Sequence, residues 1–180
     1  MYNKIRWLSM NKKKVIISWL MVMIWMGTIF YLSNMNTGES NGKSKKVIDK
    51  VITTTIDTTN QTGITDEHPT NREKEKLVDT LNKPLRKCAH ASVYFILAIL
   101  ILYSLLNTFN HLTHQYYLAI IITIVLCFIY SLSDEYHQTF VPGRTGQFSD
   151  CLIDTGGSCI GTLFYTLGNK VYKKRRKRKG

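Results

Sequence analysis

The residues of this sequence that could do chemistry fall into three groups with helical spacing. In the first group a cation, a histidine and a tyrosine follow one another at four-residue steps, so they would share one face of a helix. The groups consist of Arg86, Lys87, His90 and Tyr94, then Asp134, Glu135 and Gln138, and then Asp150 and Asp154. Such a set can bind an anion, transfer a proton or hold a divalent cation.

A short segment between the second and third groups carries a further cation. Pro142 and Gly143 favour a turn, and Arg144 follows this pair directly. The turn would present the Arg144 guanidinium over the acidic residues. We therefore expect an anionic ligand to be bound by cations and polar side chains from the first two groups and this turn, namely Arg86, Lys87, Arg144, Gln138 and Tyr94.

The histidine and the acids could also support catalysis. In an enzyme, His90, Glu135 or Asp134 would act as the general base, and Arg144 would stabilise a developing negative charge. No serine, threonine or cysteine stands in a context that indicates an activated nucleophile, so metal-activated water would have to serve.

Asp150 and Asp154 raise the question of a metal ion, because two acids at this spacing repel each other when both are ionised. A neighbouring cation, a bound divalent metal ion or protonation of one acid would offset the repulsion. The pair is therefore a candidate metal site, with a divalent cation as one of these three alternatives, whereas nothing indicates a haem, flavin or nucleotide site. A structural alternative stays open, in which the whole cluster is a set of salt bridges that knits three helices together.

The elements that must position these residues are apolar. The 180-residue chain carries 24 Lys or Arg and 12 Asp or Glu, a formal charge of +12, but none of these lies between Val15 and Gly38. From Cys88 to Ser133 the only ionisable groups besides tyrosine and cysteine are histidines. This segregation excludes a disordered chain, a disulfide-rich secreted miniprotein and a conventional soluble enzyme. It predicts an all-α, polytopic membrane protein.

Four segments could cross the membrane as a four-helix transmembrane bundle, since a span needs about 20 apolar residues. They are 15–33, 88–106, 116–132 and 150–168. The first could instead be a cleaved signal peptide, although its apolar run is long for that role. The fourth contains Asp154 and is rich in glycine, but the GxxxG spacing of Gly157 and Gly161 would let another helix approach closely.

Basic residues at both ends of the chain predict the orientation. Residues 1–14 form a basic amino terminus and residues 169–180 a basic tail, so both ends should be cytoplasmic and the number of spans even. The tail would rest on anionic lipids rather than bind nucleic acid. With this topology all three polar groups lie on the outer side of a cell membrane.

The remaining segments are an outer insertion and a membrane domain. Residues 34–84 are polar and predicted to be largely disordered, apart from a short surface helix over Arg72–Leu85, and residues 85–168 would hold three of the spans. The insertion could bind a partner if the polar cluster is only structural. A disulfide between Cys88 and Cys151 stays open, and the oligomeric state is not indicated.

Taken together, these motifs resemble the VanZ family of bacterial membrane proteins. The resemblance is carried by RKCAHASVY from Arg86 to Tyr94, SDEYHQTFVPGR from Ser133 to Arg144, and Asp150. It implies a small helical membrane domain, named after an accessory protein for low-level resistance to the glycopeptide teicoplanin, and no established reaction. The chain departs from the family pattern by its long insertion and by Asp154 where the family has asparagine.

The resemblance implies a protein of the Gram-positive cell envelope. We expect it to modulate the outer leaflet by binding a membrane lipid or a lipid-linked cell-wall precursor, and to confer low-level teicoplanin resistance. Two alternatives remain: a membrane-embedded hydrolase or transferase that acts on a lipid-linked phosphate, and a structural cluster with partner binding through the outer insertion.

Overall fold

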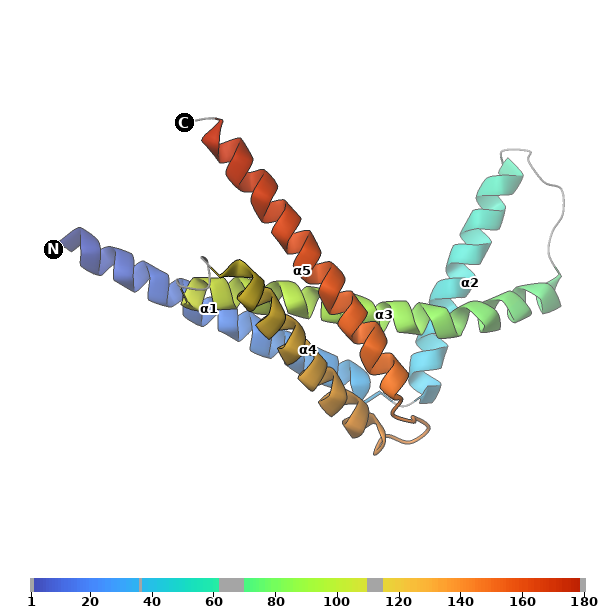
Figure 1. The fold of residues 1–180 in the computed structure, drawn as a ribbon. Coiled ribbons are helices and arrows are strands. Elements are labelled where there is room, and N and C mark those ends of the chain that lie inside the picture. Colours follow the sequence, from blue (N-terminus) through green and yellow to red (C-terminus); the bar gives the residue numbers. More distant parts are fainter. Residues whose placement is uncertain (1, 36, 62–69, 110–114, 179–180) are drawn as a thin grey trace.

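The computed structural model describes residues 2–35, 37–61, 70–109 and 115–178. These residues form five α-helices and no strand, which confirms the all-α prediction. The helices are α1 (Tyr2–Ser33), α2 (Thr37–Gln61), α3 (Asn71–Thr108), α4 (Tyr116–Gln138) and α5 (Phe148–Lys177). Figure 1 shows α1, α3, α4 and α5 packed across one another, with α2 set apart against the amino-terminal part of α3.

Three of the helices are long and apolar enough to cross a membrane. They are α1 over Lys12–Ser33, α3 over Arg72–Thr108 and α4 over Tyr116–Gln138, and they contain the first three predicted spans. Large apolar side chains on them face outward, as Ile24 and Ile129 do at 69% and 56% exposure. Such side chains suit contact with lipid tails, so the fold supports the membrane class.

The fourth predicted span, 150–168, lies within α5. Among the described residues, α5 does not meet the same requirement of length and apolar composition, so the four-helix count is not confirmed. The physical reason is that the first turns of α5 carry Asp150 and Asp154 and its last turns are strongly basic. Asp154 is nevertheless fully buried, so this part of α5 belongs to the packed interior.

Two glycines bring α5 against α3. A Cβ at Gly157 would collide with the carbonyl oxygen of Ala91, and one at Gly161 with the carbonyl oxygen of Phe95. The close helix approach predicted from the GxxxG spacing is therefore confirmed, and its partner is α3.

Hydrogen bonds and a small apolar core hold α1 to the other apolar helices. The Trp25 indole donates to the Val93 carbonyl of α3 at 2.9 Å, and the Tyr130 hydroxyl of α4 donates to the Met26 carbonyl at 2.7 Å. Leu97 of α3 is fully buried among them. These contacts satisfy polar groups that would be costly to leave unpaired in an apolar medium.

Helix α3 is longer than a membrane is thick. It has 38 residues, which corresponds to about 57 Å of helix against roughly 30 Å of hydrocarbon. A capping box of Thr70 and Glu73 starts the helix well before its apolar part, and Pro84 lies inside it. The surface helix predicted over Arg72–Leu85 is therefore the projecting first part of α3.

The insertion 34–84 contains more helix than its polar composition suggests. Helix α2 packs against the projecting part of α3, where Lys45 and Asp79 form an ion pair at 2.7 Å. Ile48 of α2 and Val78 of α3 are both buried. The physical reason for the difference is that each helix has one small apolar face, and the two faces can be buried only by pairing.

The α4–α5 connection and the two chain ends lie in different parts of the molecule. In Figure 1 the α4–α5 connection lies near the end of α1, whereas both chain ends point away from it.

Cys88 and Cys151 are free thiols, so the disulfide left open by the sequence does not form.

Candidate functional site: a polar cavity at one end of the apolar helices

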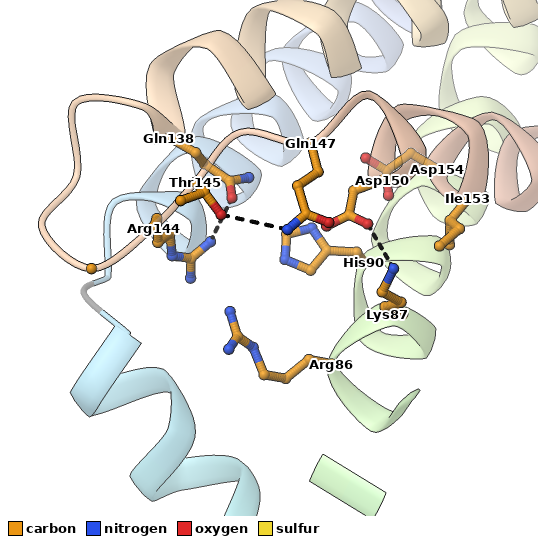
Figure 2. Close-up of a pocket in the computed structure, with 11 residues that line it drawn as sticks. Arg86, Lys87, His90, Gln138, Arg144, Thr145, Gln147, Asp150, Ile153 and Asp154 are labelled. Atoms are coloured by element: carbon orange, nitrogen blue, oxygen red, sulfur yellow. Dashed lines mark hydrogen bonds and ion pairs between the residues drawn. The ribbon is translucent and has the colours of Figure 1, made fainter. Parts of the chain in front are cut away.

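A cavity of about 370 Å³ lies where α3, the end of α4 and the start of α5 meet (Figure 2). We call it the polar cavity. Its lining consists of Arg86, Lys87 and His90 from α3, Gln138 from α4, Gly143, Arg144, Thr145 and Gln147 from the α4–α5 loop, and Asp150, Ile153 and Asp154 from α5. Most of the residues predicted from the sequence therefore lie around one space, and Tyr94, Asp134 and Glu135 do not line it.

The α4–α5 loop carries Arg144 into the cavity through a tight turn. Gly143 has a φ of 76°, and the Arg144 amide donates to the Val141 carbonyl at 3.1 Å. This combination requires glycine at the third turn position, because other residues rarely adopt positive φ there. The turn expected at Pro142 and Gly143 is thus present and places Arg144 beside the cluster.

Hydrogen bonds fix the Arg144 side chain. Its Nε donates to the Met35 carbonyl at 3.0 Å, and its Nη1 donates to the Gln138 amide oxygen at 3.1 Å. Both acceptors are neutral, so they orient the guanidinium, while the carboxyl groups of Asp134 and Glu135 act on its charge from behind the cavity lining. In the described part of the chain the ion pairs are Lys45–Asp79 and Lys87–Asp150, and Arg144 belongs to neither.

Arg86 adds a second guanidinium to the same space. Figure 2 shows the end groups of Arg86 and Arg144 reaching into the open middle of the cavity from opposite sides. Burial lowers the pKa of Arg144 from its ordinary value, and the positive charge of Arg86 acts in the same direction. Two like charges that destabilise each other favour an anion between them.

Asp134 and Glu135, predicted as catalytic candidates, lie behind the cavity lining. Glu135 accepts the Gln147 backbone N–H at 2.8 Å and the Gln138 amide at 3.2 Å, while Asp134 accepts the same Gln138 amide at 3.2 Å. Both carboxyl groups are buried. In this geometry they accept hydrogen bonds from the loop backbone and from Gln138, which lie next to or line the cavity, and the catalytic role stays a prediction.

The two acids predicted to hold a metal ion have separate partners. Asp150 pairs with Lys87 at 2.9 Å, and the Ser131 hydroxyl donates to Asp154 at 2.7 Å. Within the described residues, no group of three His, Cys, Asp or Glu side chains is placed to hold a metal ion. The expected offset to carboxylate repulsion is therefore supplied at Asp150 by the Lys87 cation.

His90 and Tyr94 follow one another along α3 but lie in different surroundings. His90 lines the polar cavity, and its Nδ1 is buried without a hydrogen-bond partner among the described residues. Tyr94 is fully buried one turn deeper, with its ring 6.1 Å from that of Tyr130. His90 can therefore meet a ligand, whereas Tyr94 belongs to the core.

Four groups of the site were not predicted from the sequence. Thr145, Gln147 and Ile153 line the cavity, and the Met35 carbonyl accepts a hydrogen bond from Arg144. The position of Gln147 between the Pro-Gly turn and Asp150 was a usable signal for the loop residues. A backbone carbonyl at the end of α1 carries no such signal, because any residue type supplies one.

The fold and the site define a class: an all-α membrane protein with a cation-rich cavity at one end of its apolar helices. A family model described as VanZ/LLP1 matches residues 18–169, so the chain belongs to this family. The match confirms the resemblance seen in the sequence motifs. The chain matches no curated protein and no solved structure in the same comparisons.

Proposed function

We propose that this protein crosses the cell membrane four times, with both ends in the cytoplasm, and binds an anionic phosphate head group in the polar cavity at the outer leaflet. The head group would belong to a membrane lipid or a lipid-linked cell-wall precursor. The observation that carries the proposal is the pair of guanidinium groups, Arg86 and Arg144, that reach into one cavity.

The charges around the cavity support an anionic ligand. Lys87 and Asp150 pair with each other, and the guanidinium groups of Arg86 and Arg144 line the same space. The hydrogen bonds from Arg144 to neutral acceptors leave it oriented for a phosphate or carboxylate, which arginine binds through its fixed fork of donors.

Two features support the proposed topology. Basic residues at both chain ends favour retention in the cytoplasm. Helix α5 packs closely on α3 through Gly157 and Gly161, as a small-residue face does between spans. With α5 as the fourth span, the cavity lies at the outer surface, where glycopeptides act on cell-wall precursors.

In the cell, occupation of the cavity would change the presentation of these head groups and give low-level teicoplanin resistance. The test is teicoplanin susceptibility of a sensitive Gram-positive host that expresses wild type, Arg144→Gln or the exposed control Lys46→Gln, with membrane levels compared by blotting. We expect wild type and Lys46→Gln to protect and Arg144→Gln not to. Equal protection by Arg144→Gln at equal membrane level would show that the cavity cations are not required.

A second candidate is hydrolysis or transfer at the head group, and one observation favours it. His90 lines the cavity beside both arginines and has a buried nitrogen with no partner among the described residues, as an unoccupied general base would. Release of phosphate or alcohol from a lipid-linked phosphate by purified wild type, lost in His90→Gln with head-group binding retained, would establish it.

A further inference from the structure

A second cavity, of about 200 Å³, adjoins the polar cavity on the side of α1. We call it the apolar groove. Its lining consists of Ile29, Leu32, Met35, Ser44, Arg86, Ala89, His90, Val93 and Arg144. The apolar part of the wall comes from α1, α3 and Met35, Ser44 of α2 also lines it, and Arg86, His90 and Arg144 line both spaces.

The apolar part of the groove belongs to helices that can cross a membrane. Ile29 and Leu32 lie in the last turns of α1, and Ala89 and Val93 lie in α3 just after the cavity cations. Leu32 is 42% exposed, so this wall reaches the outside of the bundle. A groove of this kind adjoins lipid tails on one side and two guanidinium groups on the other.

We propose that the ligand is an anionic phospholipid whose phosphate lies between Arg86 and Arg144 and whose acyl chain occupies the apolar groove. This inference rests on the proposed head-group site and names the class of molecule that fills it. A soluble anion would use only the polar cavity and leave the apolar wall uncovered. An apolar helix of a second copy would cover the groove but would place nothing in the adjoining polar cavity.

The arrangement matches the shape of an amphiphile. The cations lie at the junction of the two spaces, so one molecule can place its charge there and extend its chain along α1 and α3. Burial of the chain adds apolar contact to the charge-assisted hydrogen bonds of the phosphate. Affinity should therefore depend on both halves of the ligand.

The experiment measures binding to the purified full-length protein in detergent by calorimetry. The probes are dioctanoyl phosphatidylglycerol, glycerophosphoglycerol as the same head group without chains, and dioctanoyl phosphatidylcholine as the zwitterionic control. The variants are Ala89→Phe, which fills the groove, Ile96→Phe as an exposed α3 control that lines neither cavity, and Arg144→Gln.

We expect wild type to bind the anionic lipid more tightly than either other probe. Ala89→Phe should weaken lipid binding by about tenfold, the factor given by roughly two buried methylene groups, with glycerophosphoglycerol binding unchanged. Unchanged head-group binding also shows that the variant is folded. Ile96→Phe should bind the probes as wild type does, and Arg144→Gln should weaken the binding of both anionic probes.

Three outcomes would overturn the inference, and they are distinguishable from failure of the proposed function. Lipid binding by Ala89→Phe equal to wild type would exclude the groove and leave the head-group site standing. Equal affinity of wild type for both anionic probes would indicate a soluble anion as the ligand. A change of oligomeric state in Ala89→Phe without a change in lipid binding would assign the groove to a second copy. Binding of neither anionic probe by wild type would reject the proposed function itself.

Discussion

At the scale of single residues, the site separates groups that line the polar cavity from groups that hold them. Arg144 and His90 line the polar cavity, whereas Glu135 and Asp134 accept hydrogen bonds from the residues around it. A carboxylate that accepts the Gln147 backbone N–H anchors the whole α4–α5 loop. Loss of such an anchor should loosen the loop before it changes the chemistry of the cavity.

We therefore expect Glu135→Ala to raise hydrogen exchange at the Gln147 amide and to weaken anion binding several-fold. A hydrogen bond to a charged group contributes about 1.5–3 kcal/mol, and the alanine variant loses it. Glu135→Gln keeps an oxygen that can accept the same N–H, so its effect should be smaller. Exchange mass spectrometry with a binding titration checks this, and normal exchange with abolished binding would mean that Glu135 contacts the ligand directly.

A second prediction concerns the Lys87–Asp150 pair, whose side chains are 45% and 31% exposed. Solvent screens a pair at this exposure, so Lys87→Gln should change the free energy of unfolding by less than about 1 kcal/mol. Its effect on anion binding should also be smaller than that of Arg144→Gln, because Lys87 is already compensated. A larger loss of binding in Lys87→Gln would show that the lysine leaves Asp150 when the ligand binds.

Residue types and four-residue spacing were sufficient to predict most of the cavity lining, because helical periodicity places those side chains on common faces. The division between Glu135 and His90 could not be predicted. It depends on how the loop folds back over the end of α4, and one carboxylate among several gives no sign of which direction it faces.

At the scale of elements, the two glycines of α5 set its distance from α3. Gly157 and Gly161 face backbone carbonyls, and a Cβ there has no room, whereas one at Gly156 would meet nothing within 4 Å. The three positions lie on one helix and differ mainly in this contact, so they form a matched set.

Gly157→Leu should lower the thermal midpoint in detergent by several degrees, because overpacking costs typically 1–3 kcal/mol. Gly156→Ala should leave stability the same or slightly raised, since alanine is the better helix former. Differential scanning fluorimetry compares the two. A Gly157→Leu protein as stable as wild type would mean that α5 and α3 are free to separate.

The apolar helices could be predicted from hydropathy, since an apolar run of about 20 residues without charges is typical of a membrane-spanning helix. The amount of helix in the insertion could not, because α2 is polar on most of its surface and gains its one buried side, at Ile48, only by packing on α3. The matching face of α3 is also hard to predict, because Val78 is surrounded in the sequence by charged residues.

At the scale of the whole molecule, the number of spans decides which side of the membrane each end occupies. In the part of the chain that the structure describes, three helices are apolar enough to cross, and α5 is the proposed fourth, with acids at one end and a basic run at the other. An even count places both ends together. An odd count would place the basic end of α5 outside, against the preference of lysine and arginine for the cytoplasm.

Single cysteines in a cysteine-free background can count the spans. We expect an impermeant thiol reagent to label Lys45→Cys on intact cells and Lys174→Cys only after permeabilisation. Both positions are exposed, and the four-span topology places them on opposite sides of the membrane. Labelling of Lys174→Cys on intact cells would contradict the four-span topology and leave α5 outside the membrane.

The junction between the polar cavity and the apolar groove has a consequence for supply if the proposed lipid is the ligand. Such a lipid would reach Arg86 and Arg144 along the groove lined by α1 and α3 without leaving the bilayer. Its availability then depends on its mole fraction among neighbouring lipids and on lateral diffusion, and not on its solubility in water. Occupancy of the site would then follow the lipid composition of the outer leaflet. The protein would respond to the surface density of the lipid, whereas a receptor for a soluble ligand responds to the concentration of that ligand in solution.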